Sequence, residues 1–223
     1  MTDVTSVDNP VEALIYPSLE RFQGALDSYC AVYEKLEGWR EPKLARSLLH
    51  KGARVRNGKG SWTKSDLRRI VCWKHLQPLI GRFEDSDTES RLADAFQAKD
   101  DVTKIETLCS ISGVGPAVAS ILLALTYPEE HAALDAHAWN SLCRLGFDLP
   151  SKPISGGGYT IPELLRYLTI VRNLAGHMRA PWDVAKALHA LDKVAINKKW
   201  KRELTSLRSS RSVLAPASSD PGV

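Results

Sequence analysis

The stretch from Leu108 to Gly146 constrains the fold most, because two turns within it separate three helical segments. The first helix is predicted to end at Ile111, since Gly113 and Gly115 bracket a single apolar residue, Val114. Glycine at both positions allows a tight backbone hairpin that side chains would block. The sequence therefore predicts two helices joined by a Gly-Val-Gly hairpin.

The helix after the hairpin begins at Pro116, where the missing N–H of proline costs nothing. Ala119, Leu122 and Leu123 supply its buried face. The helix start leaves several backbone N–H groups without a partner, and such groups bind phosphate without regard to base sequence. For the hairpin taken alone, the alternative to a phosphate-binding motif is an ordinary helical hairpin such as any all-α protein contains.

A further helix start follows, and Asp135 leads it. This aspartate stands between apolar Leu134 and the helical run from Ala136 to Leu145, so it is predicted to be the N-cap. The helix dipole and the backbone donors at such a position favour the ionised carboxylate. Asp135 is therefore either a structural cap or a reactive carboxylate.

The chain resembles the helix-hairpin-helix DNA glycosylases, the superfamily that includes endonuclease III and the 8-oxoguanine glycosylases. The resemblance rests on the spacing L-x-x-I-x-G-V-G-x-x-x-A-x-x-L-L, followed by L-D-A-H. Asp135 occupies the place of the family's catalytic aspartate, and His137 that of its histidine. Bifunctional members carry a catalytic lysine two residues after the second hairpin glycine, where this chain has Ala117.

The resemblance implies an all-α, bilobal helical bundle with a helix-hairpin-helix motif at residues 108–123. It implies that double-stranded DNA is the partner, and that a phosphate binds at Gly113, Val114, Gly115 and Ala117, with His137 donating to phosphate or sugar. No cofactor is required, although a monovalent cation can bind at the two hairpin glycines. The sequence shows no alternating strand pattern of useful length and no internal repeat, which also favours an all-α fold.

Residues 43 to 82 carry eleven Lys and Arg residues and one acid, Asp66, a local net charge of +10 against +4 for the whole chain. A solvated surface would explain this charge, but next to the hairpin it favours contacts with phosphate. Lys74 could instead enter the site and restore lyase chemistry. The residues predicted to contact DNA are Arg54, Arg56, Lys59, Lys64 and Lys74.

Cleavage of an N-glycosidic bond builds positive charge on the sugar, which an ionised carboxylate such as Asp135 stabilises. Without a lysine at position 117, hydrolysis to an abasic site is expected rather than strand cleavage. The target base must leave the stack. Candidate base-pocket residues are Trp139, Trp62, Trp73 and Trp182, each with a core position as the alternative.

These features predict a monofunctional DNA glycosylase that removes a damaged or modified base. The alternative is a non-catalytic helix-hairpin-helix module that only binds DNA. Oxidised purines, alkylated bases, deaminated bases and bulky modified bases of foreign DNA, such as that of a phage, all stay open as substrates.

Four cysteines are scattered through apolar helical contexts and are predicted to be free, buried thiols. An iron–sulfur cluster, a zinc site or a disulfide framework would need closer spacing, more partners or a secretory context. No run of the 223 residues is apolar enough to span a membrane, and the first residues lack the pattern of a signal peptide. A cytoplasmic monomer without membrane contact is expected.

The polar residues 1–10 are predicted to be mobile, residues 11–204 to form the helical domain, and the tail 205–223 to be disordered. Pro17 is predicted to divide the first helical region into a short and a long helix. Thr63 and Thr160 are predicted helix caps.

Overall fold

The computed structural model describes residues 17–36, 42–73, 83, 85–152, 158–177 and 179–212, and every regular element in these residues is an α-helix. The all-α prediction is therefore confirmed. The helices are α2 (Leu19–Gly24), α3 (Leu26–Leu36), α4 (Pro42–Arg56), α5 (Lys64–Trp73), α6 (Thr88–Gln97), α7 (Asp101–Cys109), α8 (Pro116–Thr126), α9 (Ala136–Arg144), α10 (Ile161–Ala175), α11 (Pro181–Ile196) and α12 (Lys198–Ser212).

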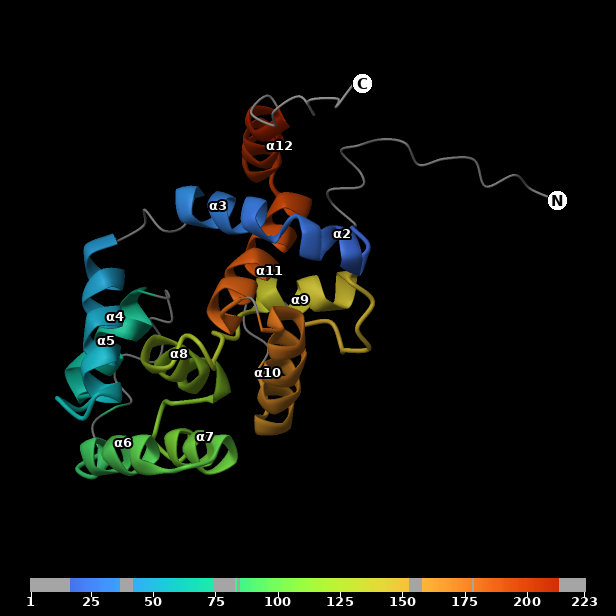
Figure 1. Cartoon of the computed structure of the whole chain (residues 1–223). Coiled ribbons are helices and arrows are strands. Elements are labelled where there is room, and N and C mark those ends of the chain that lie inside the picture. The colour runs from blue at the N-terminus through green and yellow to red at the C-terminus, as the bar shows by residue number, and fades with distance from the viewer. Residues whose placement is uncertain are drawn as a thin grey trace, which may run out of the picture.

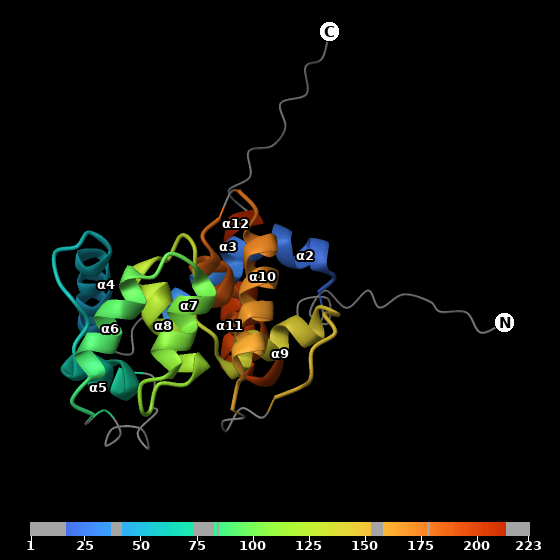
Figure 2. The same ribbon diagram turned by 90° about the horizontal axis from the view of Figure 1, so that it is seen from below.

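The helices form two groups, as Figure 1 shows. Helices α4 to α8 pack against one another in the first group, while α3 and α9 to α12 pack in the second, with α2 against α3. Helix α11 is the centre of the second group, because it contacts α3, α9, α10 and α12. Helix α10 also contacts α7 and α8 and joins the groups. In the view from below, α7, α8 and α10 lie between α4 to α6 at one end and α2 and α9 at the other (Figure 2).

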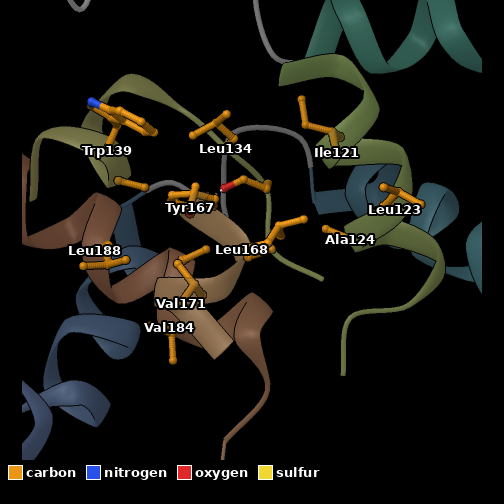
Figure 3. Packing of buried hydrophobic residues seen from close by; sticks show 14 of the residues in the cluster. Ile121, Leu123, Ala124, Leu134, Trp139, Tyr167, Leu168, Val171, Val184 and Leu188 are labelled. Atoms are coloured by element: carbon orange, nitrogen blue, oxygen red, sulfur yellow. Dashed lines mark hydrogen bonds between the residues drawn. The ribbon is translucent and has the colours of Figure 1, made fainter. Parts of the chain in front are cut away.

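Helix α8 is buried around its whole circumference from Val118 to Thr126, as expected for a helix that is apolar on every side. Helix α4 crosses it at Gly52, where an added Cβ would lie 2.0 Å from the carbonyl oxygen of Leu125. Only glycine permits this approach. On another side of α8, the core continues into α10, whose Leu168 lies among the buried side chains of both groups (Figure 3).

The segment 127–135 carries the chain from the first group to the second and is fixed by both. The N–H of Leu134 donates to Ser120 Oγ of α8 at 2.8 Å. From α10, the Tyr167 hydroxyl donates to the carbonyl of Ala133 at 2.9 Å, and Arg172 Nε donates to that of Glu130 at 2.7 Å. Because α8 and α10 both hold this segment, the residue that follows it, Asp135, has a defined position.

Several helix ends lie where the sequence predicts them. Thr160 forms a capping box with Glu163, and Thr63 Oγ1 accepts the N–H of Asp66 at 3.3 Å, so both predicted caps are confirmed. The predicted division at Pro17 stays a prediction, because residues 11–16 lie outside the described part of the chain; a further break, which the sequence did not predict, falls at Ala25 between α2 and α3. Gly24 ends α2, and glycine disfavours helix continuation.

The prediction of a disordered tail from Thr205 is also wrong for residues 205–212, which belong to α12. Trp200 and Leu204 of this helix are buried, and α12 packs on α3 and α11. Burial of these two apolar side chains stabilises a helix whose serine-rich sequence alone would not predict one. Residues 213–223 and the predicted mobile residues 1–10 lie outside the described part of the chain.

All four cysteines, Cys30, Cys72, Cys109 and Cys143, are free and half-buried. Burial raises the pKa of the Cys30 thiol to about 12 and that of Cys109 to about 11, so both are protonated and unreactive near neutral pH. Among the described residues no helix combines the length and the apolar character that a membrane span requires.

Candidate active site

Asp135 is the N-cap of α9, as the sequence predicts. Its Oδ1 accepts the N–H of Ala138 at 2.8 Å, and its Oδ2 lies 2.8 Å from Nδ1 of His189 in α11. The side chain keeps 36% of its surface exposed. Asp135 is therefore a carboxylate that is oriented by two neighbours and still open to solvent.

His137 does not face the surface, although the sequence predicts it to contact phosphate or sugar. The ring is buried, and its Nδ1 lies 2.6 Å from Oδ2 of Asp192 in α11. The reason is the helix geometry, since residues two apart on α9 point in different directions. The structure therefore places His137 inside the α9–α11 contact, away from solvent.

Asp135, His189, His137 and Asp192 form a polar cluster between α9 and α11, and Asp192 lies at its far end from Asp135. Burial raises the pKa of its carboxyl group, but hydrogen bonds from His137 and Arg144 outweigh burial and hold the pKa below its ordinary value. Arg144 Nε donates to Oδ1 of Asp192 at 3.0 Å. The two imidazole rings of His137 and His189 lie 4.8 Å apart, so the pairs Asp135–His189 and His137–Asp192 are in contact.

Sequence reasoning missed His189 and Asp192. A signal was present, because both residues interrupt the apolar face of α11 three positions apart, next to Leu188 and Leu191. Two polar residues on one buried helix face require buried partners. The pattern would have indicated a polar cluster but not that Asp135 belongs to it.

Tyr159 is a third residue that the sequence did not single out, because it follows a glycine-rich run. Its ring lies 5.4 Å from that of Trp139, and its hydroxyl oxygen is buried without a hydrogen-bond partner among the described residues. Burial and then the negative charge of Asp135 raise the pKa of Tyr159. The hydroxyl therefore stays protonated within electrostatic reach of the Asp135 carboxylate.

The turn between α7 and α8 spans Ser110 to Gly115. Gly113 has φ of 81°, a left-handed conformation that favours glycine, and the side chain of Val114 is buried. Gly115 is the N-cap of α8, and no side chain of the described residues caps this helix. The first backbone N–H groups of α8 therefore lack the partner that a cap would provide.

Arg91 of α6 holds this turn from outside, a role that the sequence did not reveal. Its guanidinium donates to the carbonyl oxygen of Ser110 at 2.8 Å and to Ser110 Oγ at 3.1 Å. Asp87 pairs with the same guanidinium at 2.6 Å. The end of α7 is thus fixed by a residue from the neighbouring helix.

Ser120 connects the turn to Asp135. Its hydroxyl donates to the carbonyl of Ala117 at 2.7 Å and accepts the N–H of Leu134 at 2.8 Å. Ala117 lies in the first turn of α8, and Asp135 directly follows Leu134. The structure therefore brings the predicted phosphate site and the predicted catalytic aspartate to the same part of α8.

The basic turn between α4 and α5 lies at the other end of α8. Gly52 packs against Leu125, and one turn later Arg56 Nη1 pairs with Glu129 at 3.0 Å, just beyond the end of α8. The 11 residues of α8 span about 16 Å. Three of the predicted DNA contacts are therefore separated from the hairpin by the length of this helix: Arg54, Arg56 and Lys59.

The other two predicted basic DNA contacts are Lys64 and Lys74. Lys64 is the first residue of α5 and is half-buried, with its backbone N–H donating to Glu89 Oε1 at 3.4 Å. Lys74 lies outside the described residues. The role of either side chain in DNA binding stays a prediction.

The base-pocket prediction is wrong for Trp62 and Trp139, because both lie in the core. The indole N–H of Trp62 donates to Thr126 Oγ1 at 3.0 Å, and that of Trp139 donates to the carbonyl of Pro150 at 2.7 Å. A buried indole offers no face to an incoming base.

The other two tryptophans, Trp73 and Trp182, are half-buried. Trp182 lies in the first turn of α11, where Lys186 Nζ is 5.8 Å from its ring centroid. The role of Trp73 and Trp182 in a base pocket stays a prediction.

A surface hollow of about 450 Å³ lies where α10 connects to α11. Its lining includes Arg172 and Arg179, but these pair with Asp101 at 2.7 Å and with Asp27 at 2.6 Å. Asp135 is not part of its lining. The hollow is therefore separate from the candidate active site.

No model of a known protein family matches the chain, and neither a curated protein nor a solved structure matches it.

Proposed function

We propose that the protein is a monofunctional DNA glycosylase, which hydrolyses the N-glycosidic bond of a flipped-out damaged or modified base and leaves an abasic site. The observation that carries the proposal is Asp135, a solvent-open carboxylate held by Ala138 and His189. It lies beside the uncapped first turn of α8, linked through Ser120. The resemblance to helix-hairpin-helix glycosylases in this same stretch supports the assignment.

The arrangement supports hydrolysis in two ways. As the bond between C1′ and the base nitrogen breaks, its electron pair leaves with the base, and the carboxylate of Asp135 stabilises the positive sugar. Water then forms a bond to C1′ and gives its proton to the carboxylate, which passes it to solvent. The departed base takes up one proton, so the products are a sugar hydroxyl and a free base.

Water is the proposed nucleophile because Ala117 stands where the family's lysine would be. Lys152 lies near the site, over the rings of Trp139 and Tyr159, but its ammonium is engaged by Glu163 at 2.8 Å. A lyase would form a Schiff base that borohydride traps on abasic DNA. We expect no trapped adduct, and an adduct that disappears in Lys152→Met would instead make the protein a bifunctional enzyme.

The second candidate is a non-catalytic DNA-binding module. It is favoured by the cap itself, because a structural N-cap would also use the Asp135 carboxylate to accept the Ala138 N–H. Under this proposal Asp135 would hold α9 and nothing more. The two candidates agree on binding duplex DNA and differ only in base release.

The test measures free bases by mass spectrometry after incubation with DNAs that carry oxidised, alkylated, deaminated or bulky modified bases. Wild type is compared with Asp135→Asn, which is well matched because asparagine caps helices as well as aspartate does. We expect one class of base to be released by wild type only. Equal release by both proteins would remove Asp135 from the mechanism, and no release with intact DNA binding would favour the binding module.

A further inference from the structure

We infer that His189 is a positioning residue for Asp135, whose Nδ1–H donates to Oδ2 and aims the carboxylate at the reacting sugar. This inference rests on the proposed glycosylase function. It adds a residue from α11, 54 positions along the chain from Asp135. His189 does not itself touch the substrate in this account.

The two carboxylate oxygens of Asp135 have different partners. Oδ1 of Asp135 accepts the backbone N–H of Ala138, and Oδ2 faces Nδ1 of His189 at 2.8 Å. An ionised carboxylate only accepts hydrogen bonds, so Nδ1 must carry the proton. Two donors on different helices fix the plane of the carboxylate. The hydrogen bond from Ala138 alone would still let the carboxylate plane rotate about that hydrogen bond.

The imidazole of His189 is itself held in place by packing. Its ring meets Tyr33 of α3 edge-on at 5.3 Å, His137 of α9 at 4.8 Å and Trp200 of α12 at 6.0 Å between centroids. Three helices therefore restrict the ring. Because packing fixes the position of this donor, the donor in turn fixes the position of the carboxylate that it binds.

The ring of His137, which packs against His189, is also held by further polar groups. This ring is anchored by Asp192 at 2.6 Å, and Arg144 Nε in turn donates to Asp192 at 3.0 Å. The cluster thus runs in the order Asp135, His189, His137 and Asp192, with groups from α9 and α11 in turn. Its inner end is buried and paired, and its outer end is the partly exposed side chain of Asp135. Such an arrangement fixes a reactive carboxylate with groups that stay away from DNA.

The kinetic test compares His189→Asn with His189→Leu. The Asn amide nitrogen takes the place of Nδ1 and keeps the donor, whereas Leu fills the space without one. We expect His189→Leu to lower kcat about 100-fold with little change in KM, since small misplacements of a reacting group cost this much. His189→Asn should restore most of kcat. Equal rates for the two variants, or a loss confined to KM, would overturn the inference.

A second readout does not need turnover. Proton–nitrogen correlation spectra of the wild-type histidine side chains at pH 8 report which nitrogen carries the proton. We expect His189 to be protonated at Nδ1 and this signal to change in Asp135→Ala. A proton on Nε2 with none on Nδ1 in wild type would overturn the pairing.

The two readouts separate the two possible failures. If wild type releases no base while His189 carries its proton on Nδ1, the glycosylase proposal fails and the pairing stands. If base is released and His189 is protonated on Nε2 but not on Nδ1, the proposed function stands and the positioning role is wrong.

Discussion

At the scale of single residues, the two aspartates of the α9–α11 contact have similar partners and different surroundings. Asp135 keeps an exposed carboxylate, whereas Asp192 is buried between His137 and Arg144. Only Asp135 can meet a substrate from solvent. We therefore propose reactivity for Asp135 and a structural role for Asp192, because the two side chains differ in exposure and not in residue type.

The buried imidazole of His131 should make stability depend on pH. Burial lowers the pKa of His131 to about 4, although Asp101, whose Oδ1 lies 3.2 Å from Nε2, acts in the opposite direction. An unfolded histidine takes up its proton near pH 6.5, so between 6.5 and 4 the unfolded chain binds more protons and stability falls as pH falls. The loss should be on the order of 3 kcal/mol between pH 7 and 4.

Urea unfolding at pH 7 and at pH 4 measures this loss. The matched variant is His131→Gln, which has no titrating ring, so its free energy of unfolding should change less over the same interval. Parallel pH dependences for wild type and variant would contradict the assignment.

The sequence predicts those parts of the site that depend on nearby residues. The caps at Thr160 and Asp135 are confirmed because a cap bonds an N–H only three positions away. His189 was missed because it meets Asp135 across 54 positions of the chain, and Tyr159 because the charge of Asp135 reaches it across 24 positions; only packing decides either distance. The tryptophans illustrate the same limit, since the sequence could not distinguish the core residue Trp139 from a surface residue.

At the scale of elements, α8 organises the first helix group, and its close contact with α4 depends on one glycine. An added methyl group at Gly52 would overlap the backbone of Leu125, with 2.0 Å to the oxygen and 2.6 Å to the carbon. Backbone atoms of a fully buried helix cannot move aside cheaply. The contact is therefore a sensitive point of the fold.

We predict that Gly52→Ala lowers the free energy of unfolding by about 3 kcal/mol or more, because overpacking forces the helices apart. The control is Gly24→Ala in α2, where an added Cβ meets nothing within 4 Å. That variant should be neutral or slightly stabilised, since alanine is the better helix former. Thermal unfolding of the two variants measures this difference in stability. Equal melting temperatures would contradict the described contact.

The start of α8 gives a prediction for DNA binding. Gly115 has φ of −91°, and an added Cβ there meets nothing within 4 Å, so side chains are tolerated. In Gly115→Asp the new carboxylate would cap α8, occupy the N–H groups and repel phosphate. Duplex affinity should fall about tenfold, which is about 1.4 kcal/mol, without loss of stability.

Gly115→Asn provides the matched control, because it offers the same cap without the charge. Fluorescence anisotropy at two salt concentrations should show weaker binding for the Asp variant than for the Asn variant, with the gap narrowing at high salt. If both variants bind as tightly as wild type, the start of α8 does not contact phosphate.

Helix positions were predictable where apolar periodicity is strong, as in α8, α10 and α11. The helix α12 was not, because its serine-rich sequence resembles a disordered tail and its stability comes from the burial of Trp200 and Leu204. Such long-range burial has no local signature.

At the scale of the whole molecule, the arrangement of the two helix groups explains the position of Asp135. The segment 127–135 passes from the first group to the second, with α8 and α10 holding it. The sequence did not predict that α3 would join the C-terminal helices. Nor could it show that the basic turn between α4 and α5 lies at the far end of α8 from the hairpin.

The central claim is that Asp135 performs chemistry and does not only cap α9. The most direct test uses one duplex from which wild type releases a base, and measures single-turnover release and equilibrium binding for wild type and Asp135→Asn. We predict that the variant binds this duplex as wild type does while its rate falls on the order of 1,000-fold, as expected for loss of a charge that stabilises the transition state. A variant that releases the base at the wild-type rate would contradict the account.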